Sequence, residues 1–98
     1  MREYVFKEPM HYRLVRDRDG KGNSGPILFS FGSSKEDSRG NVIRVGYGVE
    51  VGSFTSTYSD ARWMTTAVTN IHSAEEDEEG KIIVRFSTEN SDYTLVGT

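Results

Sequence analysis

The sequence holds two histidines, no cysteine and fifteen acidic residues, so any catalytic or metal chemistry depends on a few side chains. His11 and His72 lie 61 positions apart, whereas transition-metal sites gather histidine, cysteine and carboxylate ligands at close spacing. No serine lies in a Gly-x-Ser-x-Gly nucleophile turn. We therefore expect no catalytic residue, no metal site and no cofactor, and a protein that is not an enzyme.

Two loops carry fragments of ligand-binding motifs without the residues that these motifs need. Residues 17–21, Asp-Arg-Asp-Gly-Lys, are similar to the start of a calcium-binding loop, but a lysine stands at the third ligand position. The twelfth position is Leu28 in place of glutamate. The glycine-rich stretch 20–25 lacks the spacing of a phosphate-binding loop. Both stretches are typical of turns, which Asp and Gly favour on their own.

A run of five consecutive acids, residues 75–79, is the strongest charge feature of the chain. Its simplest interpretation is a solvated hairpin tip that keeps a sheet edge soluble. The other interpretations are electrostatic contact with a basic protein partner and cation binding. Residues 52–60 carry two aromatics among hydroxyl groups, which suits either a protein contact surface or a lid on the core. The candidate protein-binding residues are therefore Phe54, Tyr58, Glu75, Glu76, Asp77, Glu78 and Glu79.

Positive charge gathers in the first half of the chain. Residues 1–44 carry nine Lys and Arg against six acids, and residues 45–98 carry three against nine, so the halves have charges of +3 and −6. The total of −3 does not support a general affinity for polyanions. A local basic and aromatic surface would still bind single-stranded nucleic acid by stacking and phosphate contact. The candidate residues for that alternative are Tyr12, Arg13, Arg16, Arg18 and Lys21.

The elements that must position these side chains read as short strands separated by turn residues. The strongest is 42–51, where apolar residues alternate with polar residues or glycine. Gly46 and Gly48 within it predict a bend. The pattern over 61–71 favours a strand of irregular register, with a helix at about 60–72 as the alternative. The other expected strands are 10–16, 27–31, 81–87 and 91–96, with loops or turns at 17–26, 32–41, 52–60 and 74–80.

These elements and the composition predict one all-β domain over residues 1–98. Aromatic residues make up 11% of the chain, which argues against disorder. Short strands with frequent turns predict a small antiparallel meander that closes into an SH3-like barrel or a sandwich. No apolar run is long enough for a membrane helix or a signal peptide, and we expect a cytoplasmic protein. The expected core is Leu14, Leu28, Val45, Tyr47, Val49, Val51, Trp63, Val68, Ile71, Ile82, Val84, Phe86, Tyr93 and Leu95.

The C-terminal third of the chain carries one recognisable pattern. It reads Trp63-x-Thr65-Thr66-x-Val68-x-x-Ile71, an acidic gap, and Val84-x-Phe86-x-Thr88-x-Asn90-Ser91-x-Tyr93-x-Leu95. This pattern resembles that of small, uncharacterised β-rich proteins of phages and mobile elements. The resemblance implies strands over residues 63–95 and a hint of origin, but no activity.

Three functions are compatible with these features. The first is a non-catalytic interaction module, such as a phage or mobile-element accessory protein that binds or inhibits a host protein, with the acids steering and the aromatics anchoring. The second is a single-strand nucleic-acid-binding barrel that uses the basic region 13–21. The third is a structural subunit of a larger, virion-type assembly. None of these identifies the partner or the oligomeric state.

Overall fold

The computed structural model describes residues 1–7, 10–32, 37–52 and 63–98, and this part of the chain contains strands and no helix. All strand pairs are antiparallel. The strands are β1 Glu3–Val5, β2 Tyr12–Arg16, β3 Gly22–Gly25, β4 Ile27–Phe31, β5 Ser38–Gly40, β6 Val42–Arg44, β7 Gly48–Gly52, β8 Trp63–Met64, β9 Val68–Glu76, β10 Ile82–Thr88 and β11 Asp92–Gly97. The described residues include no helix long and apolar enough to cross a membrane.

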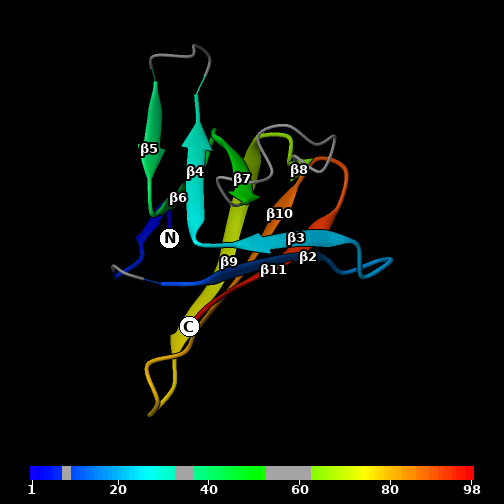
Figure 1. Ribbon diagram of the computed structural model, residues 1–98. Helices are drawn as coiled ribbons and strands as arrows, with labels where there is room; N and C mark the ends of the chain where they lie inside the picture. Colours follow the sequence, from blue (N-terminus) through cyan, green and yellow to red (C-terminus); the bar gives the residue numbers. More distant parts are fainter. Residues whose placement is uncertain (8–9, 33–36, 53–62) are drawn as a thin grey trace.

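The strands form three sheets (Figure 1). The largest has five strands in the order β3-β2-β11-β10-β9, the second has four in the order β5-β4-β7-β8, and β1 pairs with β6. Pro26 alone separates β3 from β4, so the chain turns there from one large sheet into the other. Proline has no N–H to donate to a ladder, which suits a position where pairing changes. In Figure 1, β2 and β3 run across the direction of β4 and β5, and the two large sheets therefore pack with crossed strands.

The core lies between the sheets and follows the alternation of side chains along each strand. In β10, Ile82, Val84 and Phe86 are buried, and in β11 Tyr93 and Leu95 lie opposite them. Eleven of the fourteen expected core residues are buried, which confirms most of that prediction. Val45 and Tyr47 are only half-buried, and the side chain of Trp63 lies outside the described part. The buried residues that the sequence pattern did not predict are Phe6, Tyr12, Val42 and Ile43.

Asn41 joins all three sheets. It has a positive φ of 58°, a conformation that asparagine tolerates better than most residues. Its backbone N–H donates to the Leu28 carbonyl of β4, and its carbonyl accepts from the Phe6 N–H after β1. Its side-chain Oδ1 accepts a hydrogen bond of 2.6 Å from the Tyr12 hydroxyl of β2. One turn residue thus fixes the N-terminal segment, the four-stranded sheet and the five-stranded sheet relative to one another.

The expected strand 42–51 is wrong as a continuous element. It divides into β6 and β7, and the chain turns at residues 45–47. Gly46 has a φ of +93° there, a value that glycine adopts readily, so the predicted bend at this glycine is confirmed. Its N–H donates to the Val68 carbonyl, and the Val68 N–H donates to the Tyr47 carbonyl. The turn therefore meets the beginning of β9.

Other local predictions fare unevenly. The strand predicted over 61–71 is confirmed in part: residues 63–64 lie in β8 and 68–71 in β9, but residues 65–67 are not strand and the two strands belong to different sheets. The alternative helix is absent from residues 63–72. β9 continues to Glu76, so the turn begins later than the predicted residue 74. The expected loops 17–26 and 32–41 are partly wrong, because they contain the edge strands β3 and β5. The predicted all-β class is confirmed, but the strand pairing of the described residues closes no barrel.

Gly22 provides a sharp test of the β2–β3 pairing. A Cβ at this position would lie 1.7 Å from the Leu14 carbonyl oxygen, and backbone would have to move to accept it. We expect Gly22→Ala to lower the free energy of unfolding by about 1–3 kcal/mol, the usual cost of overpacking. Gly40→Ala is the matched control in the edge strand β5, because its Cβ would make only ordinary contacts of 3.7 Å or more. Urea unfolding of both variants measures the difference, and equal stabilities would refute the close approach.

Candidate functional site

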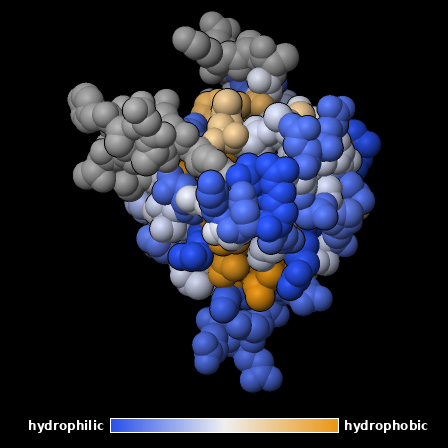
Figure 2. All heavy atoms as spheres, turned by 90° about the vertical axis from the view of Figure 1, so that its right-hand side faces the viewer, coloured by the Kyte–Doolittle hydropathy of each residue, from blue (hydrophilic) through white to orange (hydrophobic). Residues whose placement is uncertain are grey.

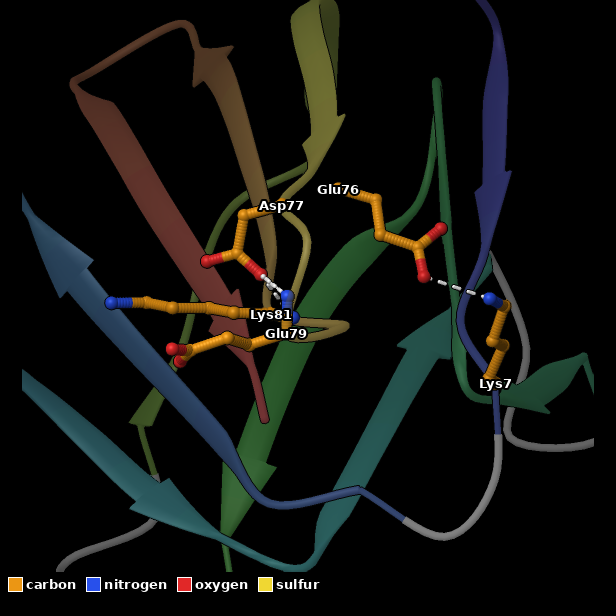
Figure 3. A network of polar contacts seen from close by, with 5 residues as sticks. All are labelled: Lys7, Glu76, Asp77, Glu79 and Lys81. Atoms are coloured by element: carbon orange, nitrogen blue, oxygen red, sulfur yellow. Dashed lines mark hydrogen bonds and ion pairs between the residues drawn. The ribbon is translucent and has the colours of Figure 1, made fainter.

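The acidic run forms the end of the β9–β10 hairpin, which projects at the bottom of Figure 1. Two of the five acids have structural partners (Figure 3). Asp77 Oδ1 accepts hydrogen bonds from the backbone N–H groups of Glu79 (3.0 Å) and Lys81 (2.8 Å), and so it closes the turn. Glu76 pairs with Lys7 at 2.8 Å, and their hydrogen bond raises the pKa of the Lys7 ammonium group.

The other three acids of the run remain exposed: Glu75, Glu78 and Glu79. The structure gives their carboxylates no ion pair or hydrogen bond within the described part of the chain. No group of three or more His, Asp or Glu side chains in the same part of the chain is arranged to hold a metal ion. The run thus combines a capped turn with three charges that face solvent at the far end of the molecule from the four-stranded sheet (Figure 1).

The basic candidates lie on and beside the β2–β3 hairpin, but they do not form one surface. Tyr12 is 1% exposed and belongs to the core, so its ring is closed to a stacking base. Arg16 forms two hydrogen bonds of 2.6 and 3.0 Å with the Asp19 carboxylate. Arg13, Arg18 and Lys21 are exposed and have no partner among the described residues. The structure therefore keeps three of the five candidates available to a ligand.

The aromatic candidates Phe54 and Tyr58 lie outside the described residues. The described part of the chain instead places two other rings on the outer face of the four-stranded sheet, of which Phe29 is exposed and Phe31 is half-buried. Phe29 and Phe31 project from β4 with their ring centroids 6.0 Å apart. On the neighbouring strands, Phe29 lies opposite Gly40 and Phe31 lies opposite Gly48. Because glycine has no side chain, these two positions leave space beside the rings.

The serine between these rings explains their direction. Ser30 is buried, and its hydroxyl donates to the Val42 carbonyl. Because neighbouring strand residues face opposite ways, burial of Ser30 turns Phe29 and Phe31 outward. The alternation Phe-Ser-Phe was compatible with either face, and pattern alone would place the aromatics in the core.

An open groove of about 320 Å³ continues this apolar face. Met64, which is 60% exposed, stands at its side. A Cβ on Gly48 would lie 2.8 Å from the Thr65 carbonyl oxygen, so glycine is needed for β7 to pass this close. Figure 2 shows apolar atoms exposed on an otherwise polar face of the molecule. The groove is lined by Phe31, Gly32, Gly46, Gly48, Met64, Thr65 and Ala67.

A chain of polar side chains crosses the outer face of the five-stranded sheet from β9 to β11. The Asn70 amide donates to His72 Nδ1 at 3.2 Å, which leaves the proton on Nε2. His72 Nε2 then donates to Ser87 Oγ at 2.5 Å, and the Ser87 hydroxyl donates to Asp92. A nucleophilic serine gives its proton to histidine, whereas this serine gives it to a carboxylate. The chain of bonds therefore ties three strands together and does not activate the hydroxyl group.

The comparisons with known proteins give no relative. No family model, no curated protein and no solved structure matches this chain. The case for a function therefore rests on the surfaces of the molecule itself.

The Arg16–Asp19 pair supplies a pH test. Its hydrogen bonds lower the pKa of the Asp19 carboxyl from 3.8 to about 2. Because the folded-state pKa is the lower one, the pair stabilises the fold above about pH 4, and this contribution is lost as the pH falls toward about 2. We expect carboxyl-carbon NMR to show Asp19 titrating near pH 2. In Arg16→Gln its pKa should return toward 3.8, and an unchanged titration would contradict the pairing.

Proposed function

We propose that the protein is a non-catalytic interaction module that binds another protein through the outer face of its four-stranded sheet. The observation that carries this proposal is the apolar group formed by exposed Phe29 and Met64 with half-buried Phe31, beside a groove of about 320 Å³. Contiguous exposed apolar surface is unusual on a small protein and commonly marks a contact site. Aromatic residues and methionine are also enriched in the buried centre of interfaces.

The chemistry of the groove indicates what it binds. Its glycines lack side chains, so a partner can approach the backbone closely, and Phe31 and Met64 provide apolar contacts at its sides. We propose that the occupant is an apolar side chain on a basic surface of a partner protein. The three exposed acids of the hairpin, Glu75, Glu78 and Glu79, would attract the same basic partner from a distance.

The origin and setting of such a module remain part of the proposal. The resemblance of residues 63–95 to small β-rich proteins of phages and mobile elements supports an accessory protein that binds or inhibits a host protein, acting in the cytoplasm. Crossed packing of two sheets occurs in barrel-like sandwiches, so the arrangement of the two large sheets is compatible with either form of the expected fold.

Substitution of Met64 tests the contact face. We expect Met64→Ser to weaken partner binding by about ten-fold or more, because it removes the most exposed apolar side chain beside the groove. Val5→Ser is the matched control, since Val5 is 64% exposed on β1, outside the four-stranded sheet. Tagged wild type and both variants are used to capture proteins from nuclease-treated host-type lysate, and affinity for the captured protein is then measured. Equal capture by the Met64 variant and the wild type would refute this face.

Neutralising the free acids of the hairpin tests steering. We expect the triple variant Glu75→Gln, Glu78→Gln, Glu79→Gln to lower the association rate by about ten-fold at low salt and to leave the dissociation rate nearly unchanged. Glu76 and Asp77 are kept because they hold Lys7 and the turn. Surface plasmon resonance with the captured partner at two salt concentrations measures both rates. Identical association rates at low salt would remove the hairpin from the binding mechanism.

A further inference from the structure

We propose a second binding site, specific for a phosphate group, in the notch beside the β2–β3 hairpin. This site is independent of the apolar face, because it lies on the five-stranded sheet. The notch has a volume of about 170 Å³ and is walled mainly by polar atoms. The residues that line it are Arg13, Leu14, Val15, Gly20, Gly22, Asn23 and Ser24.

Two hydrogen-bond donors meet at the notch. Arg13 of β2 and Ser24 of β3 are direct neighbours in the strand register, and both side chains are exposed. Neither has a hydrogen-bond or ion-pair partner among the described residues. A guanidinium group presents several N–H donors in a fixed plane that matches phosphate oxygens, and a serine hydroxyl adds one more. This pair therefore has the donor set of a phosphate site.

The neighbouring charges favour an anion. Residues 13–21 contain four Lys or Arg and two Asp, so this segment has a net charge of +2 although the whole chain has −3. Asp19 is neutralised by Arg16, and Asp17 accepts a hydrogen bond of 2.8 Å from the Thr94 hydroxyl. Arg18 and Lys21 are exposed in the turn that adjoins the notch, where the charge of Lys21 also acts on Asp19. An approaching phosphate thus meets Arg13 at the notch and a net positive charge around it.

The structure also holds the notch in shape before any ligand arrives. Gly22 lets β3 approach β2 so closely that a Cβ would meet the Leu14 carbonyl. Asn23 Nδ2 donates to the Val51 carbonyl of β7 at 2.8 Å and fixes β3 against the second sheet. The Arg16–Asp19 pair fixes the turn. The backbone that carries the two donors is thus fixed, so binding orders only the side chains of Arg13 and Ser24, which favours affinity.

Recognition at this site is limited to the phosphate group. Tyr12, the one aromatic residue of the hairpin strands, is buried, and the rings of Phe29 and Phe31 belong to the other sheet. Within the described ranges, a nucleobase would therefore find no stacking partner beside the notch. The ligand is either a small phosphate compound or the phosphodiester backbone of a single strand, bound without preference for sequence.

Two probes, inorganic pyrophosphate and a mixed-sequence single-stranded DNA, test the site and distinguish a small phosphate ligand from a phosphodiester backbone. Each is titrated into the protein at low salt and followed by amide NMR. We expect shifts at Arg13, Gly22 and Ser24, and affinity about ten-fold lower in Arg13→Gln, because a charged hydrogen bond is lost. Arg39→Gln is the matched control, since it removes the same charge from exposed β5 of the other sheet.

The outcomes discriminate clearly. Binding of pyrophosphate supports a small ligand, and binding of the oligonucleotide alone supports a phosphodiester backbone. Binding of neither probe would overturn the proposal, as would equal losses in Arg13→Gln and Arg39→Gln, which would indicate unspecific attraction. Met64→Ser should bind the probes as the wild type does. The proposal of the apolar contact face can therefore fail while the phosphate site stands, and the phosphate site can fail while the contact face stands.

Discussion

The arrangement of the three sheets depends on one turn residue, Asn41. Its backbone and side chain hold the segment after β1, the end of β4 and the ring of Tyr12 through three hydrogen bonds. The positive φ of this residue brings the three groups to one point. Most other residues would pay a steric cost in that conformation and would lack the side-chain acceptor. Both surfaces to which we assign binding take their relative positions from this junction.

Sequence patterns predicted the elements whose burial follows a regular alternation, and they failed where distant contacts impose the structure. The strands at 27–31, 81–87 and 91–96 were predicted closely. β3 contains only glycine and small polar residues, and it is a strand because β2 pairs with it and Val51 accepts from Asn23. The alternation over 42–51 continues through Gly46, although the backbone turns there. Phe6 is buried although it belongs to no alternating pattern in the sequence.

The binding surfaces show the same limit at the level of side chains. Composition shows where acidic and basic residues gather along the chain, but it could not show which charges are already paired. Lys7 lies 69 positions from Glu76, and only the folded chain brings them together. The Phe-Ser-Phe alternation allows either face, and only the burial of Ser30 in the folded chain shows that Phe29 and Phe31 lie on the outer face. The four-stranded sheet that carries them and the acidic hairpin tip lie at opposite ends of the molecule (Figure 1).

The position of β11 has a consequence for how the chain folds during synthesis. This strand lies at the centre of the five-stranded sheet, between β2 and β10, although it is translated after every other strand. Until residues 92–97 leave the ribosome, β2–β3 and β9–β10 can form only as separate hairpins, each with an apolar face unprotected. Isolated hairpins are marginally stable in water, and pairing between distant segments is slow. Cooperative formation of the five-stranded sheet therefore waits for β11, and the apolar faces of the two hairpins are open to aggregation until it pairs with them.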